Sequence, residues 1–88
     1  MLTQKSVALV PCANVGIGTN TATIRNVRTK ERVTLKGIDT VTLVGRVACI
    51  RLPVLSRDGA DVMVLLPDDR VAWVRPVAEE PALQPVNA

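Results

Sequence analysis

The sequence predicts a small all-β domain: a barrel or sandwich of about five or six short antiparallel strands, followed by an extended proline-rich C-terminal arm. Three observations lead to this fold class. Valine, threonine and isoleucine supply 27 of the 88 residues, and β-branched side chains favour pleated sheet. Turn residues recur about every 8 to 14 positions, and the segments between them show no helical period. We therefore expect one barrel domain in residues 1–75 and an arm in residues 76–88.

Breaker residues divide the N-terminal half into strand-length pieces. A first strand is expected over residues 5–10, where Pro11 ends it or places it at a sheet edge. Two glycines and two asparagines favour a loop over residues 14–20. The next two strands are expected over residues 21–28 and 32–36, with a turn between them at 29–31.

The longest alternating stretch, residues 40–52, exceeds the usual length of a strand, so it is expected to bend at Gly45. Pro53 is expected to end this strand, because proline cannot donate a hydrogen bond to the ladder. An Asp58-Gly59 turn follows. The remaining strands are expected over residues 61–66 and 70–75, with a turn between them at 67–69.

The interior is expected to be filled by aliphatic side chains, since the chain has no Phe or Tyr and a single tryptophan. Trp73 is expected to anchor either the core or an interface. The expected core residues are Val33, Leu43, Val47, Val64 and Trp73. A domain of this size has too little interior for the 48% of residues that are hydrophobic, so some aliphatic surface is expected to be covered by a partner.

The C-terminal arm contains three prolines in residues 76–88, which disfavour helix and sheet and favour an extended segment. Two interpretations remain open. The arm is either a frayed C-terminus or a contact element whose Leu83 and Val86 dock on a neighbouring subunit.

The residue types argue against catalysis, metal binding and a bound cofactor. Serine and cysteine nucleophiles need a positioned base, usually histidine, and the chain contains none. Cys12 and Cys49 lie 37 positions apart without a CxxC spacing, so both are expected to be buried free thiols. Gly16-Ile17-Gly18 lacks the third glycine of a phosphate-binding fingerprint, because position 21 is threonine. We therefore expect a non-enzymatic protein.

Hydropathy and the N-terminal residues indicate the expected cellular location of the protein. No run of about 18 apolar residues occurs, so a transmembrane helix is excluded. The apolar run at residues 7–10 is too short for a signal peptide. The expected location is the cytoplasm, or a virion if the chain is a phage protein.

Basic residues gather in the middle of the chain. Between Arg25 and Arg51, seven basic residues face two acidic ones, a balance of +5, whereas the rest of the chain carries −2. This distribution is typical either of a solvated face or of an electropositive surface for a phosphate backbone. The candidate nucleic-acid contacts are Arg25, Arg28, Lys30 and Arg32.

Residues 61–74 comprise an apolar strand, the turn Leu66-Pro67-Asp68-Asp69-Arg70 and a return segment with Trp73. This pattern resembles the late hairpin of bacterial SH3-like β-barrel domains, in which glycines occupy the positions of Asp69 and Ala72. The resemblance covers about 14 of the 88 residues and implies an SH3-like barrel. It does not imply recognition of proline-rich peptides, because this chain lacks the aromatic residues that line SH3-like ligand grooves.

The leading hypothesis is a non-enzymatic structural or interaction subunit that packs against itself or a larger protein assembly, such as a phage capsid-decorating or connector protein. Its candidate contact residues are Trp73, Arg46, Arg51, Leu83 and Val86. The alternative is a small basic nucleic-acid-binding regulator that uses the face from Arg25 to Arg51. A third hypothesis is an accessory subunit of an enzyme complex.

Overall fold

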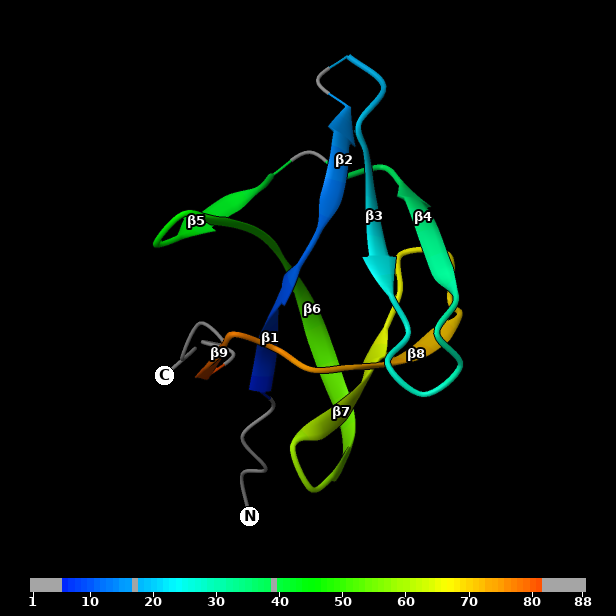
Figure 1. Cartoon of the computed structure of the whole chain (residues 1–88), viewed down its shortest axis with the longest axis vertical. Helices are drawn as coiled ribbons and strands as arrows, with labels where there is room; N and C mark the ends of the chain where they lie inside the picture. The colour runs from blue at the N-terminus through cyan, green and yellow to red at the C-terminus, as the bar shows by residue number, and fades with distance from the viewer. Residues whose placement is uncertain (1–5, 17, 39, 82–88) are drawn as a thin grey trace, which may run out of the picture.

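A computed structural model describes residues 6–16, 18–38 and 40–81 of the chain (Figure 1). All the regular elements in these residues are β-strands, and they pair antiparallel, so the prediction of an all-β domain with antiparallel strands is confirmed. Their nine strands exceed the five or six expected: β1 Ser6–Pro11, β2 Ala13–Gly16, β3 Thr21–Arg25, β4 Arg32–Lys36, β5 Thr42–Val44, β6 Val47–Asp58, β7 Asp61–Leu65, β8 Val71–Val74 and β9 Ala78–Pro81. A search of the described residues for a helix long and apolar enough to span a membrane finds none.

The strands form two sheets. The larger sheet has the order β8-β7-β6-β1-β9, with β5 also paired to β6, and the smaller sheet has the order β2-β3-β4. Cys12 alone separates β1 from β2, so one stretch of chain passes from the larger sheet into the smaller one (Figure 1). The sheets are tied again at the β3–β4 turn, where the Val27 amide donates to the Trp73 carbonyl oxygen at 2.8 Å.

One aliphatic core lies between the sheets. Period-two alternation directs its members inward, as in β3, where Ala22 and Ile24 are buried between more exposed neighbours. The core residues are Ala8, Val10, Ala22, Ile24, Leu35, Ile50, Leu52, Val62, Val64, Leu66, Ala72 and Val74. Three alanines and several valines keep the facing side chains short, which lets the two sheets pack closely without aromatic residues.

The predicted core was partly wrong. Val64 is fully buried and Val33 packs against the core, as expected, and Trp73 is partly buried. Leu43 and Val47, however, are 70% and 42% exposed. Both residues belong to the hairpin formed by β5 and β6, which lies outside the region enclosed by the two sheets (Figure 1).

Gly45 does not bend a single strand but forms a hairpin turn with Arg46. Val44 pairs with Val47, so residues 40–52 divide into β5 and the start of β6. The φ angle of Gly45 is 62°, the left-handed conformation that the first residue of a type II′ hairpin turn requires. The prediction of one long strand over residues 40–52 was therefore wrong.

Pro53 does not end its strand either, since β6 runs from Val47 to Asp58. Strand β5 pairs with β6 only as far as Cys49, and β7 pairs with β6 only from Val54 onward. Between these points β6 is paired with β1 alone, so a residue without an N–H is tolerated there. A bulge follows at Leu55, which is 52% exposed.

Two other segments differ from the prediction. Residues 14–16 of the loop expected over residues 14–20 belong to β2, whose register with β3 shifts between Ala13 and Gly16, where Asn14 has a positive φ of 51°. Residues 78–81 of the expected arm form β9, which pairs with β1. Leu83 and Val86 lie outside the described residues.

The β7–β8 turn has the geometry that its sequence suggests. The Asp69 amide donates to the Leu66 carbonyl oxygen at 3.0 Å, and the Leu66 amide donates to the Arg70 carbonyl oxygen at 2.8 Å. Pro67 occupies the first central position, where its fixed φ fits. Asp69 adopts a positive φ of 67°, so it stands where a glycine would be free of strain.

Candidate interaction surfaces

Basic and acidic side chains are distributed unevenly over the molecule. Five arginines form ion pairs whose acidic partners lie on or beside the larger sheet: Arg28 with Asp58 and Asp61, Arg51 with Glu80, Arg57 with Glu79, Arg70 with Asp68, and Arg75 with Asp61. Within the described part of the chain, five other basic residues have no acidic partner: Arg25, Lys30, Arg32, Lys36 and Arg46. Four of these five lie on β3, β4 or the turn between them, so uncompensated positive charge is concentrated on the smaller sheet.

Three of the uncompensated cations project from the outer surface of β3 and β4. Alternation directs Ala22, Ile24 and Leu35 into the core, so the residues between them point away from it. We call this surface the basic face, and it comprises Thr21, Thr23, Arg25, Arg32, Thr34 and Lys36.

The strand register fixes the order of the side chains on the basic face. Arg25 pairs with Arg32 at one end, and Thr21 pairs with Lys36 at the other. Between them, the Oγ1 atoms of Thr23 and Thr34 lie 3.2 Å apart. The basic face thus carries three cations and three hydroxyl groups, and no acidic side chain.

An open groove of about 440 Å³ adjoins one end of the basic face. The residues that line the groove include Thr23, Arg25 and Arg32 of β3 and β4, Cys12 at the β1–β2 junction and Asn14 of β2. The polar side chains around it are cationic or neutral, which favours an anionic ligand over a cationic one.

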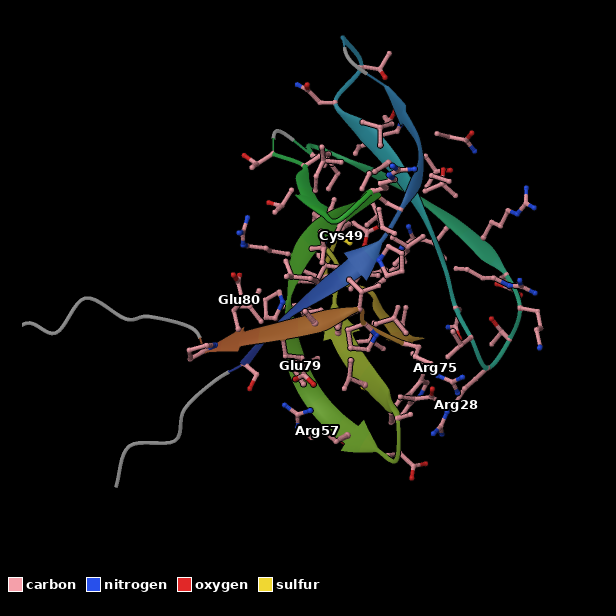
Figure 2. All side chains as sticks on the ribbon, turned by 60° about the vertical axis from the view of Figure 1, so that its left-hand side comes forward. Arg28, Cys49, Arg57, Arg75, Glu79 and Glu80 are labelled. Carbon is pink, nitrogen blue, oxygen red and sulfur yellow. The ribbon has the colours of Figure 1, made fainter. Side chains whose placement is uncertain are left out.

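Arg28 does not belong to the basic face, although the sequence grouped it with Arg25 and Arg32. Its guanidinium lies 3.9 Å from the centroid of the Trp73 ring and donates to Asp58 at 2.6 Å and to Asp61 at 3.4 Å (Figure 2). The hydrogen bond to Asp58 is the main cause that raises the pKa of Arg28. Arg75 donates to the same Asp61 carboxylate. The cation therefore covers one face of the tryptophan ring and ties the β3–β4 turn to the larger sheet.

Arg46 stands at the tip of the β5–β6 hairpin, which carries aliphatic side chains on both of its faces. Pairing of Val44 with Val47 and of Leu43 with Ala48 places Leu43 on one face and Val47 on the other. Both residues are exposed, so the hairpin presents apolar side chains to solvent on each face, and these are candidates for burial against a partner.

Arg51 is engaged within the chain rather than free for a partner. From β6 it donates to Thr42 of β5 and, at 2.8 Å, to Glu80 of β9. Arg57, further along β6, forms a bidentate pair with Glu79 of β9 and also donates to Ser6 of β1 at 3.2 Å (Figure 2). Two ion pairs thus fasten β9 beside β1.

The Arg57–Glu79 pair predicts a dependence of stability on pH. Hydrogen bonds from Arg57 hold the pKa of Glu79 below its ordinary value. A depressed carboxyl pKa stabilises the fold above the ordinary pKa of about 4.3, and this contribution is lost as the pH falls through the folded-state value. We expect Glu79→Gln to lower the thermal unfolding midpoint at pH 7 and to have progressively less effect below about pH 4. Equal destabilisation at both pH values would contradict this role of the carboxylate.

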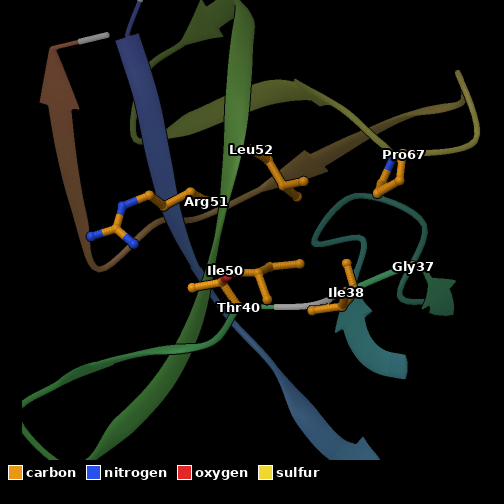
Figure 3. Close-up of a pocket in the computed structure, with 7 residues that line it drawn as sticks. All are labelled: Gly37, Ile38, Thr40, Ile50, Arg51, Leu52 and Pro67. Carbon is orange, nitrogen blue, oxygen red and sulfur yellow. The ribbon is translucent and has the colours of Figure 1, made fainter. Parts of the chain in front are cut away.

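Cys12 and Cys49 are free thiols, and burial is the main cause that raises the pKa of each, which disfavours the reactive thiolate. A hollow of about 370 Å³ is lined by apolar side chains such as Ile38 and Leu52 together with polar groups, and Arg51 extends to the other side of the β6 ribbon (Figure 3). In residues 6–16, 18–38 and 40–81, no three His, Cys, Asp or Glu side chains gather where they could hold a metal ion.

The outward threonines are the site residues that the sequence analysis missed. The strands Thr-Ala-Thr-Ile-Arg and Arg-Val-Thr-Leu-Lys each alternate a polar residue with a buried aliphatic one, and this signal was available without the structure. Grouping by position in the chain instead brought in Arg28, whose guanidinium is engaged with Trp73 and Asp58. No protein-family model, curated protein or solved structure matches this chain.

Proposed function

We propose that the protein is a non-enzymatic interaction subunit that packs against copies of itself or a larger protein assembly through the β5–β6 hairpin. The observation that carries the proposal is the exposure of Leu43, 70%, on a two-stranded ribbon that also exposes Val47 on its other face. An isolated two-stranded hairpin is marginally stable in water, and exposed aliphatic groups there gain free energy when a partner covers them. A partner surface that receives the hairpin would bury both faces at once.

The finer architecture is part of the same proposal. We assign the domain to the SH3-like barrels, supported by the turn between Leu66 and Arg70 and by the glycine-like conformation of Asp69. A virion, where small barrels decorate or connect capsid proteins, is one setting for such a subunit, and a cytoplasmic assembly is the other. Because Ala78–Pro81 docks on β1 of its own chain, the contact is assigned to the hairpin rather than to this part of the arm.

Light scattering coupled to size-exclusion chromatography tests self-assembly. Over about 1–100 μM we expect a concentration-dependent oligomer, which the double substitution Leu43→Ser, Val47→Ser reduces to a monomer. The variant should unfold at the same midpoint as the parent chain at concentrations where the parent is also monomeric. Leu55→Ser is the control, because Leu55 is similarly exposed but lies at the β6 bulge. A chain that stays monomeric and yields no hairpin-dependent complex with a protein from its native source would refute the proposal.

A further inference from the structure

The basic face and the adjoining groove form a second candidate binding surface, independent of the β5–β6 hairpin. We propose that this surface binds the phosphodiester backbone of double-stranded nucleic acid. Four cations supply the attraction: Arg25, Arg32 and Lys36 from the face, and the exposed Lys30 from the β3–β4 turn. Residues 21–36 contain five basic residues and a single acid, Glu31, which gives the hairpin a net charge of +4.

The Arg25–Arg32 pair is the strongest sign that the surface meets an anion. Like charges directly opposite each other across an antiparallel pair destabilise a sheet, typically by a few tenths of a kcal/mol. Neither guanidinium forms an ion pair within the described residues, whereas Arg51 and Arg57 of β6 and Arg70 and Arg75 beside β8 each form one. A bound phosphate would remove this repulsion, because both guanidinium groups could donate to it from the groove that they line.

The spacing of the side chains suits a polymer of phosphates. Arg32 and Lys36 are four residues apart on one strand, so the basic face extends about 13 Å. A duplex carries one negative charge per about 1.7 Å of its axis, so a surface of this length meets several phosphates at once. The hydroxyl groups of Thr23 and Thr34, midway along the face, are donors of the kind that position a protein on phosphate oxygens.

The same surface fits a duplex better than a single strand. Single-stranded nucleic acid is usually held by stacking of its bases on exposed aromatic rings. The basic face has none, and the chain's single aromatic side chain, Trp73, is covered on one ring face by Arg28. Binding is therefore expected to rest on charge and to show little preference for sequence.

Fluorescence anisotropy with a labelled 20-base-pair DNA duplex tests the proposal. We expect micromolar binding at about 50 mM salt, with a slope of about −3 to −4 in log K against log salt, since four cations release counterions. The substitutions Arg25→Thr and Arg32→Thr together should weaken binding at least about tenfold and reduce the slope by about two. Arg70→Gln with Arg75→Gln removes the same charge from other surfaces and should change both quantities much less.

The thermal unfolding midpoint separates lost binding from lost folding. Because Arg25→Thr with Arg32→Thr replaces a repulsive pair by a threonine pair, the midpoint is expected to stay or rise in the absence of DNA. Lys36→Gln alone, outside that pair, should reduce the slope by about one and gives a second test if the double variant does not fold. The proposal is overturned by undetectable binding at 50 mM salt, by equal losses in the control, or by equally tight binding of a single strand or of poly-glutamate.

Discussion

Leu35→Ala is expected to lower the free energy of unfolding by about 2–5 kcal/mol, the usual cost of a cavity at a buried leucine. Leu35 is 2% exposed and brings β4 of the smaller sheet against the core residues of the larger one. A domain of this length has a total stability of roughly 4–13 kcal/mol, so the loss is a large fraction of the whole. In a thermal scan the midpoint should fall by about 10 °C or more.

Leu43→Ala is the matched control, since the same atoms are removed from a leucine that is 70% exposed. Its effect on stability is expected to stay within about 0.5 kcal/mol. Denaturation in guanidinium chloride, with the slope compared between variants, measures both changes. A cost at Leu43 equal to that at Leu35 would show that the β5–β6 hairpin is packed in the free chain, and would contradict its assignment as an exposed contact element.

The contrast between these two leucines shows where the sequence was sufficient and where it was not. Alternation in residues 32–36 puts Leu35 on the same face as Val33, an expected core residue, and this face is the inward one because β4 is a single uninterrupted strand. In residues 40–52 the same alternation continues across the turn at Gly45. A two-residue turn reverses the parity of the faces, so Leu43 comes to share a face with Ala48 rather than with Val47. Period-two patterning alone cannot distinguish a hairpin turn at Gly45 from a bend within one strand, because glycine suits both structures.

The positions of the charged side chains were likewise only partly predictable from the sequence. The sequence predicts a basic region between Arg25 and Arg51, and the structure places Arg25 and Arg32 side by side on one surface. Local sequence could not predict that Arg28 packs on the Trp73 ring, because the ion-pair partners of Arg28, Asp58 and Asp61, lie about 30 residues away in the chain. Which cations remain uncompensated depends on such long-range pairs, and these follow from the sheet order rather than from local composition.

The C-terminal strand is the clearest case of a local rule overridden by the fold. Pro76 and Pro81 suggested a segment unable to join a sheet, yet residues 78–80 between them contain no proline. An edge strand needs its N–H groups on one side only, so a proline at its end is tolerated. Arg51 and Arg57 then supply ion pairs to Glu80 and Glu79 that no local pattern could indicate.

Removing β9 is therefore expected to be the second large perturbation. A chain that ends after Val77 loses both ion pairs and the strand that flanks β1, while Leu9, which is 5% exposed, loses its neighbour Ala78. Exposure of a leucine together with several backbone hydrogen bonds predicts a loss of about 2–3 kcal/mol. Guanidinium denaturation measures it, and a chain that ends after Pro81 separates the contribution of β9 from that of residues 82–88.

The same truncation should also change how the protein associates. Without β9, β1 becomes an edge strand with unpaired N–H and C=O groups, which act as a template for pairing with another chain. We expect oligomers that persist when Leu43 and Val47 are replaced by serine, in contrast to those of the full chain. If the truncated protein with both serines were a stable monomer, β9 would contribute packing but no protection of the edge, and the ion pairs of Glu79 and Glu80 would have no role in keeping β1 covered.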